Sequence, residues 1–145
     1  MSGYMPSPRE WVAEQVELYE GSQGTQGTTL RDTGLPVIIV TNRGVKTGAV
    51  RKTPLMKVVD GNSYILVGSQ GGAPKHPLWV HNLQAEPKVD IRDGADVYPM
   101  RVREVVNSVE RQRLWDIAVA AFPPYQEYQG KTDRVIPVFI AETTN

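Results

Sequence analysis

Residues 63–83 read SYILVGSQGGAPKHPLWVHNL, and this stretch holds the features that decide the fold. Its first residues are mostly β-branched or aromatic, which is typical of a strand. Gly71 and Gly72 follow, and adjacent glycines let the backbone turn and approach a ligand closely. Pro77 then fixes φ at the start of a short helix, predicted from Leu78 to Leu83, whose N-terminal amide groups face the loop. Together with a nearby lysine, this glycine loop (residues 68–75) favours an anionic ligand.

The same stretch also has a purely structural interpretation. In that interpretation Gly71-Gly72 is only a turn, and Trp79 and Leu83, four residues apart, are core residues on one helical face. The distribution of charge favours a binding site. The basic segment (residues 33–85) has six basic residues and one acid, a net charge of +5, which leaves −5 on the rest of the chain. We therefore expect a positive pocket for a compact anion on an otherwise acidic surface.

Length and composition limit the class of protein. The chain has 145 residues, no cysteine and a formal net charge of zero. One domain of this length, spanning residues 1–145, buries a core without disulfides. The lack of cysteine excludes a thiolate nucleophile and fits the cytoplasm. We expect no membrane span and no signal peptide, and no nucleic-acid partner, because phosphate binding needs an excess of basic residues.

The remaining segments predict a mainly β domain, an antiparallel barrel with flanking helices. Ser7, Pro8 and Glu10 have the pattern of a capping box, which predicts an amphipathic helix within residues 1–20. Residues 21–34, rich in glycine and threonine, predict a loop. A second long helix is expected from its N-cap, Asn107, to Pro123-Pro124. Strands are predicted at residues 35–41, 49–59, 63–67, 87–92, 97–105 and 135–141.

One of these strands carries three polar residues that suit a phosphate. Arg51 offers a bidentate guanidinium, Lys52 a point charge and Thr53 a hydroxyl donor. The alternative is that they form a solvated strand face. The turn at residues 60–62 predicts a hairpin onto the strand that ends at Gly68, so Arg51 and Lys52 are expected on the partner of the strand that delivers the glycine loop. Pro54 predicts an edge or a bulge.

No constellation for hydrolysis or metal binding is visible in the sequence. His76 and His81 lie five residues apart without a carboxylate motif, and the pattern G-x-S-x-G is absent, which disfavours a nucleophile or a metal site. A borrowed cofactor explains a cationic, glycine-lined pocket in such a chain. Tyr125 and Tyr128, three residues apart, are placed either to donate hydrogen bonds to a carbonyl or nitro oxygen or to pack under the barrel mouth.

Three motifs, in order along the chain, resemble the deazaflavin-dependent nitroreductase family of actinobacteria. They are RKTPL at residues 51–55, GSQGGAPKHPLWVHNL at residues 68–83 and FPPYQEYQGKTDRVIP at residues 122–137. The resemblance covers about residues 37–140. It implies a split β-barrel of the FMN-binding-like type that binds the reduced deazaflavin coenzyme F-420. The implied reaction is hydride transfer to a quinone, a nitroaromatic or an activated alkene.

The resemblance also implies roles for individual residues. The coenzyme of the family has a phosphate and an oligoglutamate tail, in agreement with the basic segment. The implied binders of phosphate and tail are Arg51, Lys52 and Thr53. The implied contacts of the deazaflavin ring are Ser69, Gln70, Gly71, Gly72, Ala73 and Lys75, with Pro54 and Trp79 as walls. Tyr125 and Tyr128 lie over the acceptor, orienting it and supplying a proton through a phenol or water.

Several alternatives stay open at this point. An FMN-dependent reductase on the same barrel and a non-catalytic carrier of deazaflavin or flavin both fit a cationic glycine loop. Some nitroreducing members of the family carry a tyrosine where this chain has Phe122, which bears on nitroimidazole reduction and not on coenzyme binding. A small-molecule acceptor, a homodimer and peripheral contact with the inner face of the cell membrane are further expectations.

Overall fold

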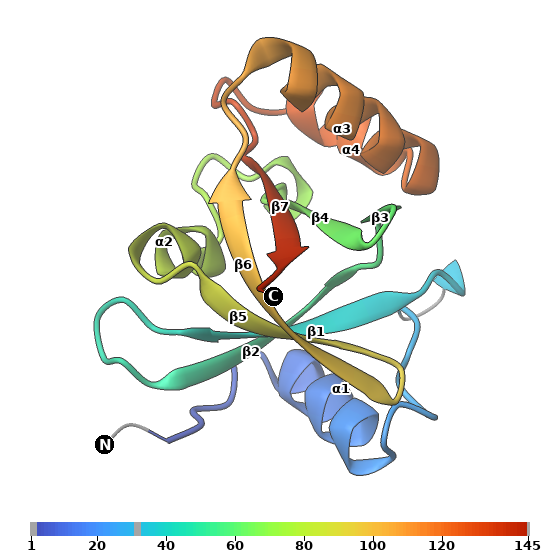
Figure 1. Cartoon of the computed structure of the whole chain (residues 1–145), viewed down its shortest axis with the longest axis vertical. Coiled ribbons are helices and arrows are strands. Elements are labelled where there is room, and N and C mark those ends of the chain that lie inside the picture. The colour runs from blue at the N-terminus through green and yellow to red at the C-terminus, as the bar shows by residue number, and fades with distance from the viewer. Residues whose placement is uncertain (1–2, 31–32, 145) are drawn as a thin grey trace.

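The computed structural model describes residues 3–30 and 33–144, in which an antiparallel sheet curls on itself with helices packed around it (Figure 1). The strands are β1 (Val37–Arg43), β2 (Val50–Met56), β3 (Val59–Asp60), β4 (Ser63–Val67), β5 (Lys88–Asp93), β6 (Asp96–Glu104) and β7 (Val138–Thr143). The helices are α1 (Glu10–Gly21), α2 (Leu78–Ala85), α3 (Ser108–Ala121) and α4 (Pro124–Gly130), with a 3₁₀ turn, η2 (Gln70–Gly72).

A single bent strand closes the sheet. The strand order is β2-β1-β5-β6-β7-β4-β3, so β2 and β3 lie at opposite ends although only Lys57 and Val58 separate them in the chain. At this bend the Lys57 amide donates to the Pro36 carbonyl, next to β1, at 2.9 Å. The Val58 carbonyl accepts from the Ile65 amide of β4 at 2.9 Å. The bend thus bonds to both ends of the sheet, and the predicted antiparallel barrel is confirmed.

The bend also corrects the predicted strand pairing. Arg51 and Lys52 lie opposite Asn42 and Thr41 of β1. Within this extended run, it is β3 and not β2 that pairs with β4. The expectation that these two cations lie on the partner of the strand delivering the glycine loop was therefore wrong. The sequence shows one continuous extended run, and the change of partner occurs inside it. β2 is an edge strand, as its proline predicted, and the N-terminal segment bridges to it only at Val50.

Three clusters of buried side chains form the core. β1 contributes to two of them because its side chains alternate between faces. Ile38 and Val40 pack with Trp79 and Leu83 of α2 in the interior cluster. Val37 and Ile39 pack on the outer side with Val16 and Tyr19 of α1. α3 and α4 cover the outer side of β4 and β7 in the third cluster. β1, within the predicted strand at residues 35–41, is therefore covered on both faces.

Two helix starts differ in how well the sequence predicted them. The Oδ1 of Asn107 accepts from the Glu110 amide at 2.9 Å, so the predicted cap of α3 is confirmed. α1 begins at Glu10 with Arg9 as N-cap. The Ser7 hydroxyl instead accepts from the Arg9 amide at 3.1 Å, two residues on, so the predicted capping box was wrong.

The last strand begins later than predicted. β7 starts at Val138, because the preceding residues are held by side chains from the helices. The Ile136 amide donates to the Gln129 Oε1 of α4 at 3.0 Å, and the Arg111 guanidinium of α3 donates to the Ile136 carbonyl.

A buried amide pair fastens α2 to β1 and to the turn that follows it. The Asn82 Nδ2 donates to the Asn42 Oδ1 at 2.9 Å, and the Asn82 Oδ1 accepts from the Val45 amide at 3.0 Å. Both asparagines are almost fully buried, where an unpaired polar group is costly. Asn82 therefore fixes the helix that follows the glycine loop.

We expect Asn82→Ala to lower the free energy of unfolding by about 2–3 kcal/mol, because it leaves the buried Asn42 Oδ1 and the partly buried Val45 amide without their partner. Gln84→Ala is the matched control, since Gln84 lies on the same helix with an exposed hydrogen bond to Glu104, and it should cost less than about 0.5 kcal/mol. Urea denaturation of the two variants measures the difference, and equal losses would contradict this role of Asn82.

Candidate functional site

The glycine loop packs directly on α4. After β4 the backbone enters the left-handed region, with φ of +44° at Gln70, +64° at Gly71 and +81° at Gly72. A Cβ at Gly72 would lie 2.6 Å from the Tyr128 carbonyl oxygen, too close for any side chain, whereas a Cβ at Gly71 would meet nothing within 4 Å. Gly72 therefore faces α4, and Gly71 faces open space that a ligand can fill.

Part of the loop's hydrogen-bonding capacity is used inside it. The Gly72 amide donates to the Ser69 carbonyl at 2.9 Å, and the Ala73 amide donates to the Gln70 carbonyl at 3.1 Å. The amide groups of Ser69, Gln70 and Gly71 donate no hydrogen bond within this turn, as at any helix start. The resemblance implied that residues 69–73 and Lys75 line a ring. The turn leaves the amides of three of these residues unused.

The three polar residues of β2 do not share one face. Arg51 and Thr53 lie opposite Asn42 and Val40, on the side of α2, and strand alternation turns Lys52 to the side of α1. There the Lys52 Nζ lies 2.6 Å from the Glu20 Oε1 and 5.1 Å from the centroid of the Tyr4 ring. No hydrogen bond or ion pair of residues 3–30 and 33–144 joins these three residues to the glycine loop.

Acids from outside the basic segment neutralise part of its charge. Lys52 pairs with Glu20 of α1, and Lys57 pairs with Asp93 at 2.9 Å. In the described part of the chain, Arg51 and the exposed Lys75 form no ion pair. Lys46 forms none either, so these three cations keep charges that no acid of the described residues neutralises.

Tyr125 and Tyr128 lie on α4 in an aromatic cluster with Phe122 and Trp115. Tyr125 is 5% exposed and meets the Phe122 ring edge-on, with centroids 5.0 Å apart. Burial, and then the neighbouring Tyr128, raise the pKa of Tyr125, so its phenol stays neutral. Tyr128 is half-buried and its ring lies 5.6 Å from the Lys131 Nζ. Of the two phenols, Tyr128 is the one with solvent access.

The two implied ring walls lie on different faces of the sheet. Trp79 is 7% exposed in the interior cluster, where its ring centroid lies 5.8 Å from that of Phe139. Pro54 lies opposite Ile39 and therefore on the outer side, with α1. Trp79 and Leu83 thus pack as core residues, as the structural interpretation of the sequence predicted. Trp79 and Pro54 do not lie together.

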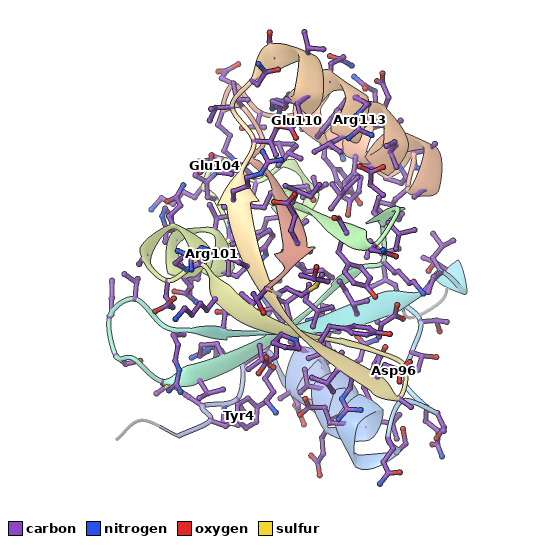
Figure 2. The ribbon with its side chains drawn as sticks, viewed as in Figure 1. Tyr4, Asp96, Arg101, Glu104, Glu110 and Arg113 are labelled. Carbon is purple, nitrogen blue, oxygen red and sulfur yellow. The ribbon has the colours of Figure 1, made fainter. Side chains whose placement is uncertain are left out.

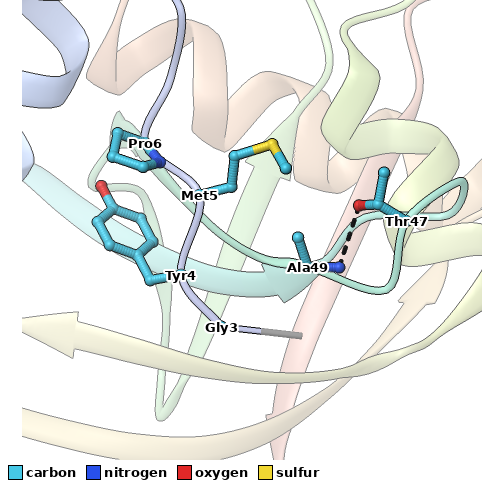
Figure 3. Close-up of a pocket in the computed structure, with 6 residues that line it drawn as sticks. All are labelled: Gly3, Tyr4, Met5, Pro6, Thr47 and Ala49. Carbon is cyan, nitrogen blue, oxygen red and sulfur yellow. Dashed lines mark hydrogen bonds between the residues drawn. The ribbon is translucent and has the colours of Figure 1, made fainter. Parts of the chain in front are cut away.

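Two cavities lie at the N-terminal segment. One, of about 390 Å³, is lined by Gly3, Tyr4, Met5, Pro6, Thr47 and Ala49 (Figure 3). The other, of about 380 Å³, is lined by Tyr4, Pro6, Ala13, Val16, Glu17, Glu20 and Gly21. Tyr4 separates the two and lies beside the edge of β2 (Figure 2). The N-terminal segment and α1 thus cover the side of β2 that carries Lys52.

Sequence reasoning missed the contacts of Arg134 and His76. Arg134 donates hydrogen bonds to three carbonyl groups of the glycine loop and lies against the His76 ring. Both residues stand in the motifs of the resemblance, but their separation in the chain gave no reason to pair them.

The sequence led us to expect neither a metal site nor a membrane span. Residues 3–30 and 33–144 contain no group of three or more histidine, aspartate or glutamate side chains that could hold a metal ion. None of the helices in the same residues is long and apolar enough to cross a membrane.

Comparison with known proteins finds similar sequences and similar solved structures. A chain from Mycobacterium tuberculosis named F420H(2)-dependent quinone reductase is 34% identical over 125 residues, covering 85% of this chain and 83% of the relative. A solved structure described as an F420-H2 dependent reductase is 48% identical with a TM-score of 0.69, covering 74% of this chain and 94% of that one. Another, described as a domain-swapped dimer, is 45% identical with a TM-score of 0.72, covering 94% of this chain and all 100% of that one.

The solved relatives support the predicted split barrel, because the strands described above superpose on a reductase of the same family. The family model of F420H(2)-dependent quinone reductases matches residues 11–143, nearly the whole chain. The chain therefore belongs to the F420H(2)-dependent quinone reductase family.

Proposed function

We propose that this protein is an oxidoreductase that uses reduced coenzyme F-420 to reduce a quinone. Membership of the F420H(2)-dependent quinone reductase family over residues 11–143 is the observation that carries the proposal. The same membership favours coenzyme F-420 over FMN, and an enzyme over a carrier protein. The first two of the three motifs that suggested deazaflavin binding from the sequence contain the cations and the glycine loop described above.

The residues of the site fit an anionic coenzyme. When bound, the reduced deazaflavin supplies the hydride. The chain supplies orientation, through the amides of Ser69 to Gly71 beside the open side of Gly71, and charge, through Arg51 and Lys75. Gln70, Gly72 and Ala73 shape the loop. Thr53, Pro54 and Trp79 belong to the proposal as further contacts. Thr53 lies on the side of α2 and Pro54 on the side of α1, and Trp79 lies in the interior cluster.

Lys52 has a competing partner inside the protein. Its ion pair with Glu20 is about three-quarters shielded from solvent, with side-chain exposures of 22% and 25%. A phosphate or glutamate tail that binds Lys52 has to displace the Glu20 carboxylate, which offsets part of the gain. Arg51, without an ion-pair partner in the described residues, has no such competitor.

We expect Arg51→Ala to weaken binding of oxidised coenzyme F-420 about tenfold or more, because it removes a charge-assisted contact. Lys52→Ala should weaken coenzyme binding less, because the wild-type lysine has to break its ion pair with Glu20 before it binds the coenzyme. Lys88→Ala, an exposed cation at the start of β5, is the matched control and should bind as wild type does. Fluorescence titration of the three variants measures these affinities. Wild-type affinity in both Arg51→Ala and Lys52→Ala would remove β2 from the coenzyme site.

The two tyrosines are proposed to act on the acceptor side. Tyr128, half-buried and beside the glycine loop, donates its phenol hydrogen to the acceptor oxygen or to a water that supplies a proton. Tyr125 packs behind it, with ring centroids 6.4 Å apart, and keeps its proton because burial raises its pKa. In this proposal Tyr128 contacts the acceptor, and Tyr125 supports the Tyr128 ring.

We expect Tyr128→Phe to lower turnover with a quinone about tenfold, the loss that one hydrogen bond to the acceptor produces, while leaving coenzyme affinity within about twofold. Tyr125→Phe is the matched control on the same helix, with a smaller loss of turnover. Steady-state kinetics with saturating reduced coenzyme measure both. Unchanged turnover in both variants would remove the tyrosines from the reaction.

Quinones fit this site better than nitroimidazoles. Phe122 is 8% exposed and its centroid lies 6.2 Å from that of Tyr128, so a tyrosine at this position would add a hydroxyl within the aromatic cluster on the acceptor side. This chain lacks that hydroxyl. We therefore propose quinones as the main acceptors, with nitroaromatics and activated alkenes as poorer ones.

Two further proposals concern assembly and location. The domain-swapped dimer among the relatives supports a homodimer, which sedimentation equilibrium of the full chain tests. The cytoplasm stays the predicted location. Peripheral contact with the inner face of the membrane follows only from the solubility of many quinones in lipid, and vesicle co-sedimentation tests it.

A further inference from the structure

The Arg134 side chain forms hydrogen bonds with the beginning of the glycine loop and with Ala73 after its turn. Its Nε donates to the Ala73 carbonyl at 2.8 Å, at the end of the loop turn. One terminal nitrogen donates to the Ser69 carbonyl at 2.7 Å, and the other donates to the Gly68 carbonyl at 3.1 Å. A guanidinium has donors only, arranged in a rigid fork, so one planar group holds three carbonyls in fixed directions.

These three bonds fix the direction of the loop's free amides. In a trans peptide the C=O and the following N–H lie in one plane and point in opposite directions. Because the Gly68 and Ser69 carbonyls point at Arg134, the amides of Ser69 and Gln70 point away from it. These are two of the three amide donors that the turn leaves unused. Arg134 therefore aims the donors that the proposed function assigns to the coenzyme.

The loop needs such a hold because its conformation is uncommon. Gln70 has a φ of +44°, a region that residues with a side chain rarely adopt. Local preference alone would not keep Gln70 there.

His76 completes the coordination of Arg134. The His76 Nδ1 lies 2.8 Å from the same terminal nitrogen that reaches the Gly68 carbonyl. Since that nitrogen is a donor, Nδ1 accepts, and the ring is neutral with its proton on Nε2. Burial, then Arg134 and then His81 lower the pKa of His76, against a smaller opposing effect of Glu104, which agrees with a neutral ring.

The segment that carries Arg134 does not depend on its side chain for attachment. The Gln129 Nε2 of α4 donates to the Arg134 carbonyl at 2.8 Å, and the Gln129 Oε1 accepts from the Ile136 amide at 3.0 Å. Arg111 of α3 holds the Ile136 carbonyl as well. The backbone is thus fixed by other residues, and the Arg134 side chain is left to act on the loop.

We infer that Arg134 is a positioning residue for the coenzyme: its guanidinium, with neutral His76, holds the glycine loop so that the Ser69 and Gln70 amides face the ligand. The identity of that ligand rests on the proposed function. The inference itself concerns the free protein, in which the loop is already held.

Arg134→Lys tests the inference, because one ammonium group keeps the charge but cannot bridge three carbonyls. Arg111→Lys is the matched control, since it replaces a guanidinium that bonds the same segment but not the loop. Amide hydrogen exchange in coenzyme-free protein follows Gly72 and Ala73, whose amides are bonded inside the turn. We expect their exchange to be about tenfold faster or more in Arg134→Lys and within about twofold of wild type in Arg111→Lys.

Coenzyme binding gives the second readout. Affinity for oxidised coenzyme F-420 should fall about tenfold or more in Arg134→Lys, with turnover at saturation nearly unchanged and a melting temperature close to that of Arg111→Lys. Exchange and affinity equal to those of the control would overturn the inference and leave the proposed function intact. Failure of the wild type to bind the coenzyme would overturn the proposed function, and hydrogen exchange would still test the loop.

A second variant covers the case in which Arg134→Lys does not fold. His76→Leu keeps Arg134 and removes only its ring partner. We expect exchange of the Gly72 and Ala73 amides to rise about threefold in this variant. Wild-type exchange in a folded His76→Leu protein would contradict the assigned pairing.

Discussion

The bend of one strand at Lys57 and Val58 is the constraint on which the rest of the structure depends. Its two hydrogen bonds, from the Lys57 amide toward β1 and from the Val58 carbonyl toward β4, join the ends of the sheet. A closed sheet has an interior that α2 covers and an outer surface that α1, α3 and α4 cover (Figure 1). The same bend separates the cations of β2 from the strand that carries the glycine loop. A ligand that contacts both therefore contacts residues of two separate strands, β2 and β4, that do not pair with each other.

Ion pairs with acids from other segments reduce the positive charge of the basic segment. Two of the six basic residues in the basic segment bind acids from elsewhere, Glu20 and Asp93, and Arg134, outside that segment, binds carbonyl groups instead of an anion. The net charge of the segment therefore overstates the field that a ligand meets. Arg51 and Lys75 carry what remains near the site. Lys52 is held by Glu20, so the first helix neutralises one of the cations of β2 although it contributes no residue to the glycine loop.

Sequence patterns predicted the parts of this structure that depend on local preference. The strand of residues 63–67, the helix after Pro77 and the Asn107 cap are all confirmed, because β-branched runs, proline and capping residues act over a few positions. The partner of β2 was predicted wrongly, since a bend inside one extended run leaves no mark in composition. The contacts of Arg134 with Gly68, Ser69 and Ala73 join residues more than sixty positions apart, and only the folded chain shows them. The assignments of Arg51 and Tyr128 stay predictions, now with a defined face and exposure for each.

Our central claim is that the cationic glycine loop binds reduced deazaflavin. Its most direct test is parallel titration of the purified full chain with coenzyme F-420 and with FMN, followed by addition of a quinone to the complex with reduced coenzyme F-420. The account predicts selective binding of the deazaflavin and oxidation of the reduced coenzyme that requires both protein and quinone. Preference for FMN, or binding of the deazaflavin without oxidation by any quinone, would contradict it.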